Sequence, residues 1–263
     1  MLTTSGRIRI TRARWLKAQQ YERGFWQRTS DAIAEGTTRQ LDWYTWRAAQ
    51  LVSLLTEAGV PVCTSGKVLE IGSGPIGIVS FLEWGERYAV DPLEPFYRQQ
   101  PHLIRLRSSE ATYLAGTGEQ LPMGDGSVAL VILDNVIDHT YSPGRILQEI
   151  ARVLQPDGRL YVCVNVHSGW GAILHDLLAR LRIDPGHPYT FTSRTLRVLL
   201  ARHGFGAVLE CVEDYEEVGA ANRRSPHITD RIKGYTGMSE FRHQIVARRE
   251  PGAGSTFDMP VDT

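Results

Sequence analysis

A short glycine-rich turn constrains this chain more than any other feature. Residues 70–77 read Glu-Ile-Gly-Ser-Gly-Pro-Ile-Gly and follow an apolar run that begins at Lys67. Glycine has no Cβ, so the backbone of such a turn can bend sharply and approach a ligand closely. The sequence therefore predicts a buried strand that ends in a ligand-binding turn and continues into a helix.

The rest of the chain predicts an α/β fold. After residue 67, short β-branched runs alternate with amphipathic stretches, which is typical of a parallel sheet with helical crossovers. A Pro-Asp-Gly turn is expected at residues 156–158. Strands are expected at residues 67–71, 87–90, 111–115, 128–133, 159–166, 207–212 and 242–248, and helices at 76–84, 142–154, 170–181 and 193–203.

The first 60 residues have a different character. They contain four of the six tryptophans, and helices are expected at residues 14–28 and 39–57. We interpret residues 1–60 as a helical N-terminal cap, whose aromatic side chains either pack between the two helices or form a lid over a ligand. Residues 61–250 then form one ligand-binding domain, and the Gly-, Ser- and Pro-rich residues 251–263 are expected to be a disordered tail.

Charge and cysteine content exclude several classes of partner and compartment. Lysine plus arginine and aspartate plus glutamate both number 29, so no dominant basic face for nucleic acid or anionic lipid is indicated. No apolar run approaches the roughly 18 residues of a membrane span, and the N-terminus lacks the apolar core of a secretory signal. Three widely spaced cysteines favour a reducing compartment. We expect a cytoplasmic monomer or homodimer.

The turn by itself fits two kinds of nucleotide site. Asp91 ends the second expected strand about 20 residues after Gly72, a distance at which an acid accepts hydrogen bonds from ribose hydroxyls. Gly-Ser-Gly-Pro-Ile-Gly also matches the dinucleotide fingerprint. Glu70, however, stands where dinucleotide-binding strands usually keep an apolar residue, and no Tyr-x-x-x-Lys pair is found. Both observations argue against a nicotinamide-dependent oxidoreductase, which is kept as an alternative because the glycine pattern matches.

The order of the segments resembles that of class I S-adenosylmethionine-dependent methyltransferases of the small-molecule, methyltransferase-11-like type. The family's acid-x-Gly-x-Gly motif, which holds the methionine end of the cofactor, matches Glu70, Gly72 and Gly74. The family's acid at the end of the second strand binds the ribose hydroxyls, and Asp91 matches it.

Three later segments extend the resemblance over residues 66–212 and 240–249. Residues 117–123 are similar to the family's Asp-Ala-Glu-x-Leu-Pro-Phe, with Thr117 in place of the acid that contacts adenine. Residues 134–139 resemble the stretch that ends in Glu-His, and residues 154–160 resemble Leu-x-Pro-Gly-Gly-x-Leu. The resemblance implies a Rossmann-like, doubly wound sheet of seven strands with the last strand antiparallel. It implies cofactor contacts at Glu70, Gly72, Ser73, Gly74, Asp91, Pro92, Gly118, Glu119, Asp134 and Asn135.

Histidines supply the candidates for acid–base chemistry. His139 and His167 each follow an expected strand at the rim where the cofactor's methyl group would point, so each is a candidate general base or, alternatively, a structural histidine. His187 and Tyr189 lie in a segment similar to one that shapes the acceptor pocket in related enzymes. The eight histidines show no ligand-like spacing, so no metal is expected.

These features predict methyl transfer by in-line displacement to a small-molecule acceptor, such as a sugar or a secondary-metabolite scaffold, with O- or N-methylation favoured. Residues 217–240 are expected to form a loop whose basic residues either bind an anionic group of the acceptor or face solvent. A non-catalytic, S-adenosylmethionine-binding assembly subunit is the second alternative, because Thr117 replaces the expected acid.

Overall fold

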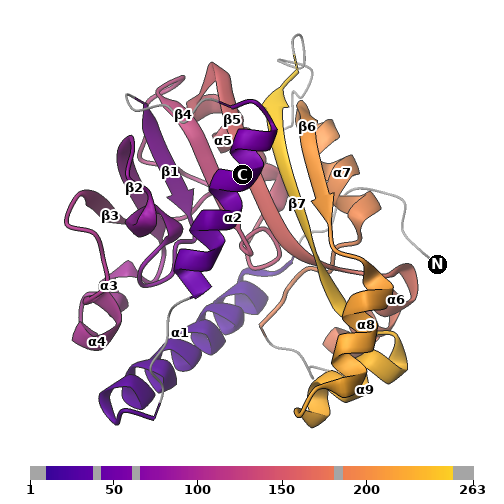
Figure 1. Cartoon of the computed structure of the whole chain (residues 1–263). Coiled ribbons are helices and arrows are strands. Elements are labelled where there is room, and N and C mark those ends of the chain that lie inside the picture. Colours follow the sequence, from indigo (N-terminus) through magenta and orange to yellow (C-terminus); the bar gives the residue numbers. More distant parts are fainter. Residues whose placement is uncertain (1–9, 38–42, 61–65, 181–185, 251–263) are drawn as a thin grey trace.

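Seven strands form one sheet in the order β3-β2-β1-β4-β5-β7-β6 in the computed structural model, which describes residues 10–37, 43–60, 66–180 and 186–250 (Figure 1). Strands β1 to β5 run parallel, and β7 is antiparallel to both of its neighbours. The predicted doubly wound sheet is thereby confirmed. The strands are β1 (Lys67–Ile71), β2 (Glu86–Asp91), β3 (Ala111–Ala115), β4 (Val128–Asp134), β5 (Leu154–His167), β6 (Phe205–Val212) and β7 (Glu240–Arg249).

Helices cover both faces of the sheet because its central strands are apolar on both sides. Along β4, Val131 and Leu133 join the core on one face, and Leu130 and Ile132 join the core on the other. The helices are α1 (Arg12–Ala34), α2 (Trp43–Glu57), α3 (Glu94–Tyr97), α4 (Pro101–Ile104), α5 (Pro143–Val153), α6 (Gly169–Arg180), α7 (Ser193–Arg202), α8 (Tyr215–Arg224) and α9 (Ile228–Thr236).

The prediction of a helix at residues 76–84 is wrong. The structure has only a short 3-10 turn, η1 (Ile78–Phe81), after the glycines. Ile76, Val79 and Leu82 are all buried, so this segment fills the core between β1 and α2 and presents no polar helical face to solvent. Tertiary packing has overridden the amphipathic pattern here.

The predictions of a turn at residues 156–158 and of a loop at residues 217–240 are also wrong. Residues 156–158 lie within β5, where Val128 pairs with Leu154 and Leu130 with Arg159, so the intervening residues bulge out of the ladder. The expected loop at residues 217–240 consists mainly of α8 and α9. The Asp214 side chain caps α8 by accepting from the backbone N–H groups of Glu216 and Glu217, and Gly237 ends α9 in the left-handed conformation.

The N-terminal helices lie over the part of the sheet that matters for ligand binding. Figure 1 shows α1 crossing the lower edge of the sheet, where the parallel strands end, and it shows α8 and α9 below β6 and β7. Helix α2 packs Leu51 and Leu55 into one core. The division at residue 60 into a cap and a separate domain stays a prediction, and the expected tail at 251–263 lies outside the described residues. Among the residues that are described, no helix is long and apolar enough to cross a membrane.

Candidate cofactor and acceptor site

A cavity of about 310 Å³ opens at the carboxyl ends of β1, β2 and β4. Open α/β sheets generally bind ligands at this edge. All of the cofactor contacts expected from the sequence line this one cavity: Glu70, Gly72, Ser73, Gly74, Asp91, Pro92, Gly118, Glu119, Asp134 and Asn135. The sheet therefore brings together residues that four separate segments supply.

The glycines of the turn have conformations and surroundings that a side chain would not tolerate. Gly72 and Gly74 have φ angles of 66° and 62°, in the left-handed region that favours glycine. A Cβ on Gly72 would lie 2.5 Å from a methyl group of Val136, and one on Gly74 would lie 2.7 Å from the Tyr44 hydroxyl oxygen. The turn thus exposes backbone to the cavity, as the sequence predicts.

The two acids of the motif hold the turn in place. One carboxylate oxygen of Asp91 accepts from the backbone N–H of Gly74 at 2.9 Å, and the other accepts from that of Leu93 at 2.8 Å. Glu70 accepts from the backbone N–H of Val79 at 2.9 Å. Burial raises the pKa of Asp91 to about 7 and that of Glu70 to about 8, against the lowering effect of these hydrogen bonds.

Asp134 and Glu119 have partners within the protein. Oδ1 of Asp134 accepts from Arg47 of α2 at 2.7 Å, and burial raises the pKa of Asp134 while Arg47 opposes that rise. Oε1 of Glu119 accepts from the backbone N–H groups of Tyr141 and Ser142, at the start of α5. Glu119 therefore lines the cavity while its carboxylate stabilises a helix N-terminus.

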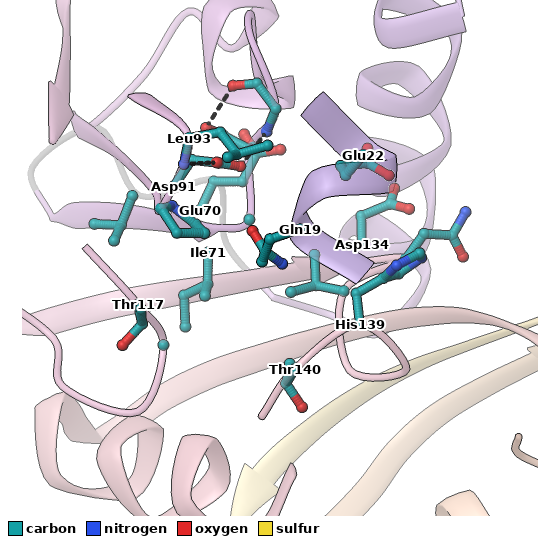
Figure 2. A pocket seen from close by; sticks show the side chains of 18 of the residues that line it. Gln19, Glu22, Glu70, Ile71, Asp91, Leu93, Thr117, Asp134, His139 and Thr140 are labelled. Atoms are coloured by element: carbon teal, nitrogen blue, oxygen red, sulfur yellow. Dashed lines mark hydrogen bonds between the residues drawn. The ribbon is translucent and has the colours of Figure 1, made fainter. Parts of the chain in front are cut away.

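The N-terminal helices supply a wall of the cavity that sequence reasoning did not resolve. From α1, Trp15, Gln19, Glu22 and Trp26 recur at spacings of three and four residues and so share one helical face. Figure 2 shows Gln19 and Glu22 on the helix that passes beside Asp91, Asp134 and His139. This spacing can be read from the sequence. The sequence does not show which strands have their ends covered by this face of α1.

Helix α2 closes the wall on the side of the glycine turn. Trp43, Tyr44 and Arg47 line the cavity, and the Tyr44 hydroxyl donates to the carbonyl oxygen of Ser73 at 3.3 Å. The rings of Trp43 and Tyr44 stack with their centroids 3.8 Å apart. Tyr44 is 3 % exposed and Trp26 is 5 % exposed, so these aromatics both pack in the core and border the cavity.

The predicted catalytic histidines fall in different places. His139 lines the large cavity, and 26 % of its side chain is exposed. His167 is buried in a smaller adjacent cavity, where burial lowers its pKa to about 4. That smaller cavity also contains the predicted acceptor contacts His187 and Tyr189, together with Asp138, Asn165, His175, Thr190, Phe191 and Glu240.

The structure brings together histidines that no ligand-like spacing links in the sequence. His139 and His187 lie far apart in the sequence, yet their ring centroids are 4.6 Å apart. Asp138, His139 and His187 each have a potential ligand atom within 4.8 Å of the other two. No spacing rule finds such a set, because the fold alone brings the segment after β4 beside the segment before α7.

Comparisons with known proteins agree with this arrangement. Residues 69–162 match the family model described as a methyltransferase domain. An uncharacterised methyltransferase of Mycobacteroides abscessus is 32% identical over 124 residues, which cover 45% of this chain and 48% of that protein. This chain therefore spans about half the length of the curated relatives it matches.

Solved structures share the fold at low sequence identity. The YcgJ protein of Bacillus subtilis has a TM-score of 0.52 and 17% identity, covering 76% of this chain and 99% of that one. A phosphoethanolamine N-methyltransferase of Haemonchus contortus has a TM-score of 0.54 and 15% identity, covering 77% and 52%. Residues 69–162 therefore form a methyltransferase domain, which carries the acid-x-Gly-x-Gly turn and lies within a seven-stranded sheet of the same fold as these solved structures.

Proposed function

We propose that this protein transfers the methyl group of S-adenosylmethionine to an oxygen or nitrogen atom of a small-molecule acceptor, such as a sugar or a secondary-metabolite scaffold. The observation that carries the proposal is the convergence of the whole expected cofactor set on one cavity. We propose further that the reaction takes place in the cytoplasm and involves no nucleic acid.

The cavity suits the charge and shape of this cofactor. The methionine end would lie along residues 70–74, the ribose hydroxyls would donate to Asp91, and the adenine would lie near Thr117 and Gly118. Glu22 and Asp134 give the walls an acidic character that favours a sulfonium and an ammonium group. Trp26 and Trp43 add aromatic surface.

The acceptor would enter from the side of the two histidine-lined cavities. Methyl transfer from a sulfonium is an in-line displacement with a good leaving group, so the protein contributes mainly by positioning the acceptor and excluding water. His139 borders the large cavity, and Asp138, directly before it in the chain, borders the smaller one. A base at this point would accept the proton that an oxygen or nitrogen acceptor releases.

We expect S-adenosylhomocysteine and S-adenosylmethionine to raise the melting temperature by several degrees, and NAD(H) and NADP(H) to leave it unchanged. A ligand at about 100 times its Kd adds about 2.7 kcal/mol to the free energy of unfolding, which corresponds to several degrees in a chain of this size. Differential scanning fluorimetry with all of these ligands in parallel tests this. A shift with a nicotinamide alone would overturn the proposal in favour of an oxidoreductase.

We expect the His139→Ala variant to turn over at least 100-fold more slowly, because a positioned acid–base group contributes about 10²–10⁴-fold. Its affinity for S-adenosylhomocysteine should stay within about twofold of wild type. The rate is measured as S-adenosylhomocysteine release with an acceptor found by screening. Unchanged turnover would assign His139 a structural role. Cofactor binding without turnover on any acceptor would instead favour the assembly-subunit alternative.

A further inference from the structure

Three potential metal ligands converge where the two cavities meet. Asp138 and His139 follow β4, and His187 precedes α7. Nε2 of His139 lies 3.7 Å from Oδ2 of Asp138, and one ligand atom of His187 lies within 4.8 Å of both residues' ligand atoms. Two ligands that each bind one ion at about 2.1 Å lie roughly 3–4 Å apart. Small rotations of the side chains therefore bring all three atoms into coordination distance.

One carboxylate oxygen of Asp138 lacks a hydrogen-bond partner among the described residues, and a bound cation would compensate for this. Asp138 is 7 % exposed, and its Oδ1 has no hydrogen-bond partner among the described residues. A buried carboxylate oxygen without a partner is costly, since it has lost its hydration and gained nothing in return. A positive charge between Asp138 and the two imidazole rings removes that cost.

Backbone hydrogen bonds fix the positions of the two segments that carry the three ligands. The backbone N–H of His139 donates to the carbonyl oxygen of Val136 at 2.8 Å. The backbone N–H of Tyr189 donates to the carbonyl oxygen of Asp138 at 3.2 Å, which ties the His187 segment to the Asp138 segment. Arg14 of α1 donates to the carbonyl oxygen of His187 at 3.2 Å. The site is thus built on fixed backbone, as a metal site requires.

Polar groups behind the three ligands provide an outer layer. Glu240, His167 and His175 line the same small cavity as Asp138 and His187. The rings of His175 and His187 have centroids 6.4 Å apart, and Glu240 accepts from the Lys233 ammonium at 2.7 Å. Metal-binding imidazoles are usually oriented by such neighbouring carboxylates and polar groups.

We propose that Asp138, His139 and His187 bind one divalent transition-metal ion at the boundary between the cofactor cavity and the smaller cavity. Two imidazoles and one carboxylate suit ions such as Zn²⁺, Co²⁺, Ni²⁺ or Fe²⁺. Three protein ligands leave coordination positions open, as in catalytic rather than structural sites. His139 lines the large cavity, so the open positions adjoin the space assigned to the cofactor.

The role of this ion rests on the proposed function. An acceptor hydroxyl that binds the ion loses its proton to solvent more readily, because the ion stabilises the resulting oxyanion. The oxygen then attacks the methyl carbon of S-adenosylmethionine. The new O–C bond forms as the C–S bond breaks, and S-adenosylhomocysteine leaves with the electron pair on sulfur. In this arrangement the ion takes over the task of the protein base considered above, and the slower turnover expected of His139→Ala comes from the loss of a ligand to the ion.

Cobalt provides a direct probe of the site. The full-length chain, freed of any affinity tag and of metal, is titrated with Co²⁺ while the visible d–d absorption and the heat of binding are recorded. We expect one saturable site per chain, and at least a 10-fold loss of affinity in His187→Gln and in Asp138→Asn. His102→Gln is the matched control, because His102 is an exposed histidine on α4, outside the cluster.

S-adenosylhomocysteine affinity and melting temperature are measured on the same samples. His187 does not line the large cavity, so His187→Gln should keep its affinity for S-adenosylhomocysteine while its affinity for Co²⁺ falls. Absence of saturable Co²⁺ binding in the wild type, or equal Co²⁺ affinity in His187→Gln, would overturn the metal site even if the cofactor binds. Cobalt binding without cofactor binding would support the metal site and count against the proposed function.

Discussion

Replacing Asp91 by alanine is expected to weaken the binding of S-adenosylhomocysteine by 100-fold or more. Asp91 lies in the wall of the large cavity and is 7 % exposed, so its carboxylate meets a ligand in a poorly solvated setting. Hydrogen bonds to a charged group are worth about 1.5–3 kcal/mol each, and the loss of two of them corresponds to at least about 100-fold. The variant also loses the acceptor that holds the backbone N–H of Gly74.

Titration of the ligand against intrinsic fluorescence measures this loss, because Trp26 and Trp43 line the cavity. Asp125→Ala is the matched control, since Asp125 is an exposed aspartate whose carboxylate pairs with Arg152. Asp91→Asn keeps one acceptor and should fall between the alanine variant and the wild type. A folded Asp91→Ala protein with wild-type affinity would refute the assignment of this acid to the ribose.

The ligand-free protein should become less stable as the pH rises from 5 to 8, and Glu70→Gln should remove much of that change. Burial raises the pKa of Glu70 from 4.5 to about 8 and that of Asp91 from 3.8 to about 7. In this pH window the folded protein keeps protons that the unfolded chain has released, so the free energy of unfolding falls as the pH rises. At about 1.36 kcal/mol per pKa unit, Glu70 contributes on the order of a few kcal/mol.

Melting temperatures measured across this pH range test the prediction, and several degrees are expected to separate wild type from Glu70→Gln at pH 8. The glutamine side chain keeps an oxygen that can accept from the backbone N–H of Val79. Glu83→Gln, at an exposed position, should follow the wild-type slope. A wild-type stability that rises between pH 5 and 8, or an identical slope in Glu70→Gln, would contradict the buried, protonated carboxyl.

Parts of the site could be predicted where the local backbone conformation or burial requires a particular type of residue. A backbone that must adopt positive φ needs glycine, so Gly72 and Gly74 predicted the turn before any tertiary contact was known. A strand buried on both faces needs a mainly apolar run, and the expected bounds of β1 match the structure. Asp91 followed from its distance along the chain to that turn.

Other features could not be predicted, because they depend on what packs against each segment. Residues 76–84 have an amphipathic pattern, but the core between β1 and α2 takes up their apolar side chains and leaves only a short turn. Arg47 reaches Asp134 because α2 passes over the end of β4. Asp214 caps α8, a helix that the expected loop at residues 217–240 does not include.

The sequence by itself determined the order of the strands' apolar runs and the ligand-binding turn. Each of these follows from contacts between residues close in the chain, or from a conformation of a single residue. Only the tertiary structure decided that α1 and α2 form the cavity wall and that Asp138, His139 and His187 meet beside it. Those contacts join segments distant in the chain, and close packing of the whole sheet and its helices determines which of them can form.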